Sequence, residues 1–101
     1  MRIRLAPQAR ADLDAIWVYV ARESGRQALA TRVIGSISDK FKLFAKFPHI
    51  GNSLELEQRP NIRSFPVSNY VIFYNVWQGE IRILRIIHAS RDAYAIFDEE
   101  R

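Results

Sequence analysis

The stretch IRSFPVSNYVIFYNV (residues 62–76), followed by GEIRILRIIHASRDAYAIF (residues 79–97), carries the strongest structural signal in the chain. Val, Ile, Phe and Tyr dominate both segments, and these residue types favour strands. Two polar pairs, Ser68-Asn69 and Gln78-Gly79, interrupt the apolar runs and suit tight hairpin turns. The sequence therefore predicts an antiparallel meander. Its three expected strands are residues 61–67, 70–77 and 80–88.

Two amphipathic helices are predicted upstream of this meander, over about residues 8–23 and 26–47. Pro7 suits the first turn of the first helix, where its missing N–H costs nothing. Gly25 is able to end that helix in a left-handed conformation, and Pro48 ends the second. Apolar residues recur at helical spacing in both segments. They are Ala9, Leu13, Ile16, Trp17 and Val20, then Leu29, Val33, Ile37, Phe41 and Phe44.

The remaining segments complete the expected topology. Residues 2–5 are predicted to form a short strand, and residues 48–60, which are rich in Pro, Gly and Asn, to form a loop. Residues 89–101 suit either a short helix or an apolar tail docked on the sheet. The prediction is an α+β fold of order β-α-α-β-β-β, a single domain over residues 1–101. An N-terminal helical hairpin packs on one face of its antiparallel sheet.

Composition excludes several protein classes. Hydrophobic residues make up 49% of the 101 residues, which is typical of a globular protein and not of a disordered chain. Cysteine is absent, which excludes disulfides, thiolate metal sites and cysteine nucleophiles. The sequence has neither a run of about 18 apolar residues, as a membrane span needs, nor the apolar region of a signal peptide. We therefore expect a cytoplasmic protein that does not enter a membrane.

The net charge of +4 is unevenly distributed. Residues 1–50 contain nine Lys and Arg against four Asp and Glu, whereas residues 51–101 contain six against seven. A basic body with an acidic tail suits an anionic partner, either a nucleic acid or an acidic protein. Many soluble domains of this charge bind nothing acidic, so the charge alone does not choose between these readings.

The meander and the segment after it resemble the RelE/ParE superfamily of toxins from type II toxin–antitoxin systems, and most closely its ParE-like branch. Members typically have an Arg and a Pro in the first strand of the meander, an aromatic-rich second strand, and a third strand that ends in His-x-x-Arg-Asp. The segment FPHIG (residues 47–51) also matches a common feature of the family. The matching residues of the meander are Arg63, Pro66, Tyr70, Ile72, Tyr74, His88, Arg91 and Asp92.

The resemblance implies one of two activities. RelE-like members enter the ribosome and cleave messenger RNA through the RNA's own 2′-OH, whereas ParE-like members inhibit DNA gyrase. Both are neutralised by a cognate antitoxin, so a hetero-oligomer is expected. A decayed toxin that only binds its antitoxin is a third possibility. We predict neither a cofactor nor a metal ion.

The candidate functional residues cluster late in the sequence. RNA cleavage needs a base, an acid and cations on the phosphate. Arg63, Arg85 and Arg91 are able to bind phosphate, His88 is able to act as acid or base, and Tyr94 matches a C-terminal Tyr of some ribosome-dependent members. Without catalysis, the residues expected to bind the target are Arg63, Arg85, His88 and Arg91.

Each candidate also has a structural interpretation. His88, at the end of an apolar strand, is more often a hydrogen-bonded structural residue, and Tyr94 suits packing among apolar neighbours. Arg91 and Asp92 suit a local ion pair or a cap where the chain leaves the sheet.

Arg63 and Arg85 alternate with apolar residues. Strand alternation places Arg63 on a face with Phe65 and Val67, and Arg85 with Ile83 and Ile87. Arginines there need anionic partners from this chain, an antitoxin or the target.

The expected phosphate site is short of cations. The predicted loop contains Glu55 and Glu57 but no lysine, while Lys40, Lys42 and Lys46 all fall on the second helix. Acids in that loop would repel RNA. The sequence therefore favours a ParE-like gyrase inhibitor, with the ribosome-dependent endoribonuclease acting on messenger RNA as the alternative.

Overall fold

The computed structural model describes residues 1–56 and 59–100, which contain five strands and three helices. The helical hairpin and the meander lie as predicted, and residues 93–99 form the short helix that was one of two expectations for the tail. In chain order the elements are β1 (Arg2–Leu5), α1 (Pro7–Ser24), α2 (Gln27–Lys46), β2 (Asn52–Leu56), β3 (Arg59–Val67), β4 (Tyr70–Trp77), β5 (Glu80–His88) and α3 (Ala93–Glu99).

The sheet has the strand order β1-β5-β4-β3-β2. Strands β2 to β5 pair antiparallel, as predicted, but β1 pairs parallel to β5, with Arg2 opposite Glu80. The sheet is therefore mixed. Nothing in the local pattern of residues 2–5 reveals this, because the direction of β1 is set by a partner strand that lies more than 70 residues later.

The predicted loop over residues 48–60 was wrong in part, because β2 occupies Asn52–Leu56. This edge strand pairs only with β3, from Asn52 opposite Ser64 to Leu56 opposite Arg59, with an irregularity after Leu54. Backbone pairing with β3 holds this strand, and Leu54 packs against the cluster beneath α3. The turn-type residues at its start concealed it in the sequence. Glu57, one of the two loop acids, lies outside the described residues.

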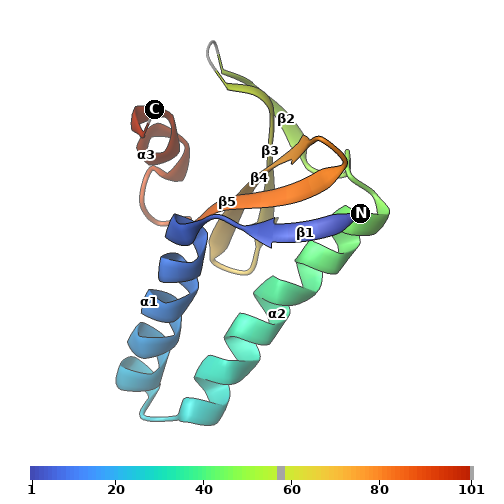
Figure 1. Cartoon of the computed structure of the whole chain (residues 1–101). Coiled ribbons are helices and arrows are strands. Elements are labelled where there is room, and N and C mark those ends of the chain that lie inside the picture. Colours follow the sequence, from blue (N-terminus) through green and yellow to red (C-terminus); the bar gives the residue numbers. More distant parts are fainter. Residues whose placement is uncertain (57–58, 101) are drawn as a thin grey trace.

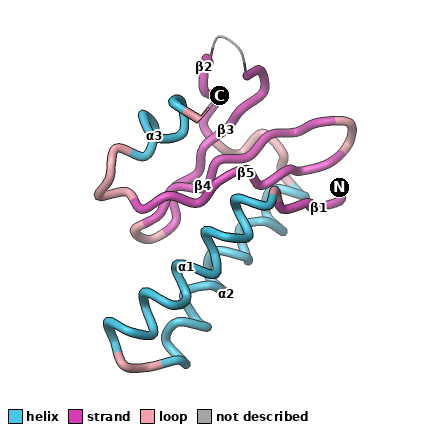
Figure 2. The backbone as a smooth tube through the Cα atoms, turned by 60° about the vertical axis from the view of Figure 1, so that its left-hand side comes forward, coloured by secondary structure: helices cyan, strands magenta, loops and turns pink. Residues whose placement is uncertain are grey.

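The helices cover opposite faces of the sheet. The α1–α2 hairpin packs on one face and projects away from it, while α3 lies on the other face (Figures 1 and 2). The core is divided accordingly. Phe44, Ile72 and Tyr74 belong to the cluster beneath the hairpin, whereas Ile62, Phe73 and Phe97 belong to the cluster beneath α3.

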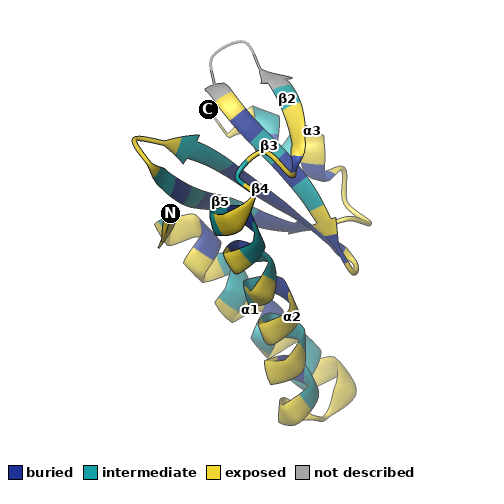
Figure 3. Cartoon of the chain, turned by 90° about the vertical axis from the view of Figure 1, so that its right-hand side faces the viewer, coloured by how far each residue is buried: buried dark blue, intermediate teal, exposed yellow. Residues whose placement is uncertain are grey.

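Burial follows the predicted helical stripes. Ile16, Ile37, Phe41 and Phe44 are buried, while the outer faces of α1 and α2 are exposed (Figure 3). In residues 1–56 and 59–100, helices lack the length and apolar character needed to cross a membrane.

The predicted turns are confirmed. Gly25 ends α1 with φ of 69°, and its N–H donates to the carbonyl of Ala21 at 2.9 Å. Gln78 and Gly79 both have positive φ, 51° and 74°, as a two-residue hairpin turn of type I′ requires. Ser68 in the other hairpin has φ of 53°.

Helix α3 is fixed at its start and along its inner face. The carboxylate of Asp92 accepts the N–H of Ala95 at 3.2 Å, which confirms the expected cap where the chain leaves the sheet. Phe97 stacks on Phe73 of β4 with ring centroids 4.3 Å apart. The acidic end of the chain is thereby held against the sheet.

Candidate functional site

A β-bulge in β5 determines where Arg85 lies. Tyr74 of β4 is opposite Ile83, but the next residue back, Phe73, is opposite Arg85, so Leu84 is an extra residue in β5. Simple alternation was therefore wrong in placing Arg85 on one face with both Ile83 and Ile87. Ile83 belongs to the cluster beneath the hairpin and Ile87 to the cluster beneath α3. The bulge directs Arg85 to the strand edge.

At that edge Arg85 is bound by two acids of its own chain. Its Nε and Nη2 donate to the carboxylate of Asp12 in α1 at 2.8 and 3.0 Å, and its Nη1 bonds Glu100, just after α3. Strand β1 stops opposite Ile83, so the following part of β5 is a free edge, and Asp12 also accepts the N–H of Ile86 at 2.8 Å. The hydrogen bonds that Arg85 donates to Asp12 raise the pKa of Arg85, against the opposing effect of burial.

This arrangement answers the question of which anion balances Arg85. Both partners are intramolecular, so its charge holds α1, β5 and the end of the chain together. Sequence reasoning missed Asp12, although a signal existed. Asp12 lies three residues after Ala9 and four before Ile16, so it falls on the buried stripe of α1, where a carboxylate needs a partner.

His88 is fixed at the end of β5. Its ring meets Tyr70 of β4 edge-on, with centroids 5.1 Å apart. Its Nδ1 accepts the backbone N–H of Ser90 at 3.0 Å and lies 2.6 Å from the hydroxyl of the same serine. In the neutral ring the proton is therefore on Nε2. The structural interpretation of His88 as a hydrogen-bonded strand end accounts for all these contacts.

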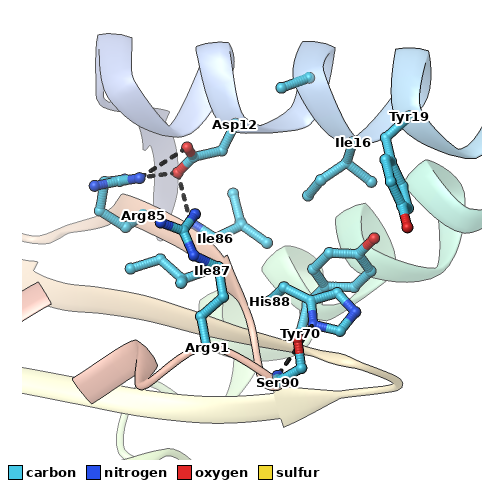
Figure 4. A pocket seen from close by; sticks show the side chains of 11 residues that line it. Asp12, Ile16, Tyr19, Tyr70, Arg85, Ile86, Ile87, His88, Ser90 and Arg91 are labelled. Atoms are coloured by element: carbon cyan, nitrogen blue, oxygen red, sulfur yellow. Dashed lines mark hydrogen bonds and ion pairs between the residues drawn. The ribbon is translucent and has the colours of Figure 1, made fainter. Parts of the chain in front are cut away.

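A groove of about 390 Å³ separates α1 from the ends of β4 and β5. Asp12, Ile16 and Tyr19 line it from the helix, and Tyr70, His88 and Arg91 line it from the sheet (Figure 4). Burial, together with the nearby Tyr19, raises the pKa of Tyr70, so the Tyr70 phenol is neutral at physiological pH. Its walls are mostly apolar.

Arg91 is the cation of this groove that is free to bind a partner. It is exposed, and within residues 1–56 and 59–100 its guanidinium makes no ion pair, in contrast to Arg85. The expected ion pair with Asp92 is absent from this part of the chain, where Asp92 instead caps α3. The groove thus combines apolar walls, one free guanidinium and the imidazole of His88.

Arg63 lies at a different place on the sheet. Arg63 of β3 is opposite Tyr74 of β4 and shares a face with Phe65 and Val67, as predicted; this is the face that the hairpin covers. Its Nη1 donates to the carbonyls of Gly51 at 2.8 Å and His49 at 3.2 Å. Its partners are backbone oxygens and not the acids that were expected. Arg63 fixes the connection between α2 and β2.

Tyr74 and Gly51 complete this connection. The Tyr74 hydroxyl donates to the carbonyl of Pro48 at 2.9 Å and accepts the N–H of Gly51 at 2.9 Å. Its ring stacks on Phe44 with centroids 4.0 Å apart. Burial raises the pKa of Tyr74, opposed by the Gly51 N–H and by Arg63.

Replacement of Arg63 by alanine is expected to lower the free energy of unfolding by about 1–2 kcal/mol, because two carbonyls lose a charged donor. Urea denaturation would measure the change. Arg32→Ala, which removes an exposed arginine from α2, is the matched control and should change stability by less than about 0.5 kcal/mol. Equal effects of the two substitutions would contradict the anchoring role of Arg63.

Tyr94 lies on the opposite face of the sheet. Its ring meets Phe73 edge-on at 5.5 Å, and its hydroxyl is 3.3 Å from the Ser64 hydroxyl. It is 47% exposed and helps to seat α3. This contact set matches the packing interpretation of Tyr94.

The four candidates for RNA cleavage do not converge. Arg63 is opposite Tyr74 and His88 is opposite Tyr70, so four residues of β4, about 13 Å, separate them along the strand. Tyr94 is across the sheet from both. Of the four, the structure brings together His88 and Arg91, which share the groove. Among the described residues there is also no cluster of side chains suited to hold a metal ion.

Comparison with known proteins identifies the family. A sequence profile described as the ParE toxin of the type II toxin–antitoxin system, parDE, matches residues 3–93. The chain belongs to the ParE toxin family. The resemblance inferred from the meander is thereby confirmed, and so is its ParE-like branch.

Relatives of the ParE family agree with this assignment. Toxin ParE1 of Caulobacter vibrioides is 30% identical over 92 residues, which cover 91% of this chain and 93% of that protein. A solved structure described as the chromosomal ParDE TA system from P. aeruginosa matches with a TM-score of 0.73 and 24% identity, covering 87% of this chain and 95% of the matched chain. This second similarity supports the predicted α+β fold.

Proposed function

We propose that this ParE-family chain inhibits DNA gyrase and is held inactive by a cognate antitoxin. The observation that carries the proposal is the groove between α1 and β5. It gathers His88 and Arg91 with apolar walls, which suits binding, whereas the side chains that RNA cleavage would require are dispersed over the sheet. Membership of the ParE family favours the same target.

The separation of the candidate catalytic side chains argues against the nuclease alternative on chemical grounds. General acid, general base and phosphate-binding cation must all reach one phosphodiester, each within hydrogen-bond distance or through one water. Arg63 is engaged with backbone carbonyls and Tyr94 is on the other face of the sheet. These positions leave His88 and Arg91 as a pair without a third catalytic group.

The same groove supports the expected antitoxin contact. Tyr19, Ile16 and Tyr70 provide apolar surface, and Arg91 provides an unpaired positive charge at the rim. An amphipathic segment with acidic residues beside its apolar face would complement both features. Such a segment would cover His88 and Arg91, and its binding would therefore block the residues proposed to contact gyrase.

Replacement of Arg91 by alanine is expected to weaken inhibition of gyrase about tenfold, which corresponds to about 1.4 kcal/mol of binding free energy. The residue is exposed, so stability should change by less than about 0.5 kcal/mol. The concentration that halves DNA supercoiling by purified gyrase measures the effect. Arg32→Ala, at an exposed position on α2, is the control with the same loss of charge and should inhibit like the unmodified chain.

Two results would contradict the proposal. The first is unchanged DNA supercoiling in the presence of the unmodified chain, and the second is translation arrest with cleavage of messenger RNA and no DNA breaks on induction. In the second case His88→Ala should abolish cleavage with the fold intact. Normal growth during unopposed expression would instead indicate a decayed toxin.

A further inference from the structure

One part of the sheet carries exposed charge that the groove does not use. On the face that α3 covers, the end remote from α3 presents two cross-strand rows. The first row is Arg4, Arg82 and Asn75 on β1, β5 and β4. The residue opposite Asn75 on β3 is Ile62, which belongs to the cluster beneath α3, so the whole row lies on the face that α3 covers. The second row is Arg2, Glu80 and Trp77. We call these six residues the arginine face; they are Arg2, Arg4, Asn75, Trp77, Glu80 and Arg82.

The arginine face concentrates positive charge, and the resulting repulsion lowers the stability of the sheet. Arg4 and Arg82 are directly opposite each other on neighbouring strands, a like-charge pairing that destabilises a sheet. Glu80 is their shared counter-ion, at 3.4 Å from Arg4 and 3.7 Å from Arg82. Three arginines therefore surround one carboxylate, and a bound anion would relieve the repulsion that remains.

Two polar atoms on the arginine face are buried without a hydrogen-bond partner. They are Oδ1 of Asn75 and Nε of Arg82, on residues that are opposite each other in β4 and β5. Buried polar atoms in folded proteins normally have partners. Oδ1 needs a donor and Nε needs an acceptor, and a ligand reaches these buried atoms only if the Asn75 and Arg82 side chains turn outward.

Trp77 adds an aromatic surface beside these atoms. It lies two residues after Asn75 on the same face of β4, and it is 44% exposed although it is a large apolar side chain. An exposed indole beside arginines is the combination with which proteins bind unpaired bases and the phosphates that link them.

We propose that the arginine face binds single-stranded nucleic acid. Phosphates pair with Arg2, Arg4 and Arg82, and one unpaired base stacks on Trp77. Asn75 turns outward on binding, and the exocyclic amino group of a base donates to its Oδ1. Carboxylates of an acidic protein would satisfy the arginines alone. A nucleotide carries an anion, a ring that stacks on an indole and an amino group in one unit, so the observations favour the nucleic acid.

Fluorescence anisotropy of a labelled oligo(dC) of about 15 nucleotides, a length within the known range of single-strand sites, tests the proposal. Each phosphate contact contributes about −0.7 to the slope of log K against log salt concentration. The double variant Arg4→Gln/Arg82→Gln should therefore make that slope shallower by about 1.4 and weaken binding more than tenfold at low salt. Arg22→Gln/Arg32→Gln, with the same charge change on the outer surface of the helical hairpin, is the matched control and should bind within about twofold of the unmodified chain.

Tryptophan fluorescence tests the stacking contact. The chain has two tryptophans, so Trp17→Phe leaves Trp77 as the reporter. Its emission should be quenched as oligo(dC) binds. The measurement includes neither gyrase nor an antitoxin, so its outcome is independent of the proposed function.

Three results would overturn the proposal. They are equal loss of affinity in the two double variants, unchanged affinity of the Arg4→Gln/Arg82→Gln variant, and binding of poly-glutamate as tight as that of oligo(dC). The last would assign the arginine face to an acidic protein. A thermal melt of each variant confirms that the fold is kept.

Discussion

Replacement of Gly51 by alanine is expected to lower the free energy of unfolding by about 3 kcal/mol, because an added methyl group has no room. A Cβ at this position would lie 2.8 Å from Cε1 and the hydroxyl oxygen of Tyr74, and 2.9 Å from the carbonyl oxygen of Ser64. The Ser64 carbonyl is backbone within β3, and the Tyr74 ring is stacked on Phe44. Neither neighbour is free to withdraw.

The hydrogen bonds around Gly51 remove the other way of relieving the clash. Its N–H donates to Tyr74 and its carbonyl accepts from Arg63, so the glycine cannot shift without losing both contacts. The loss of stability should appear as a fall in Tm of roughly 15 °C in a thermal melt.

Gly35→Ala provides a control with the opposite expected sign. Gly35 is inside α2 with nothing within 4 Å of an added Cβ, so alanine there should raise stability by about 0.5–1 kcal/mol. In the double variant Gly51→Ala/Tyr74→Phe the hydroxyl contact is gone, and the two losses should be less than additive. A Gly51→Ala variant as stable as the unmodified chain would refute the close approach.

Replacement of Asp12 by alanine is expected to lower the free energy of unfolding by about 2–3 kcal/mol. The substitution removes two hydrogen bonds from Arg85 and leaves the N–H of Ile86 without its acceptor at the free edge of β5. The side chains of Asp12 and Arg85 are both less than one fifth exposed, so water replaces the lost hydrogen bonds only partly. Chemical denaturation measures the loss.

Asp14→Ala removes the same charge from the exposed surface of α1, two residues away, and should leave stability within about 0.5 kcal/mol. Asp12→Asn should have an intermediate effect, because its amide oxygen is still able to accept from Ile86. If Asp12→Ala and Asp14→Ala were equally stable, the Asp12–Arg85 pair would contribute nothing to the fold.

The residues that specify local structure made the hairpins and helices predictable. Gln78-Gly79 supplies the positive φ values of its turn, and strand-forming residues surround it. Strand β2 was missed because its partner, and not its own side chains, makes it a strand. The bulge at Leu84 was also not predictable. Strand β5 has apolar residues that face both sides of the sheet, so its sequence pattern gives no sign of an extra residue.

The candidate site was predictable as a set of residues but not as an arrangement. His88 and Arg91 are close in sequence and share the groove, as a motif of that spacing suggests. The partner of Arg85 is 73 residues away, so only the fold reveals that its charge is already balanced. Arg63 was expected to need an anionic partner from this chain, an antitoxin or the target. Its guanidinium instead donates to backbone carbonyls of the connection between α2 and β2.

The parallel pairing of β1 with β5 has a consequence for synthesis. Arg2 of the first strand leaves the ribosome long before its neighbour, Glu80, has been made. At about 5–20 residues per second, β1 waits roughly 4–15 s for the strand beside it. The helical hairpin is complete in that interval, but the sheet and the groove on β5 are not. The groove on β5 therefore forms only after the last strand emerges, and a chain that still lacks β5 cannot bind a partner through it.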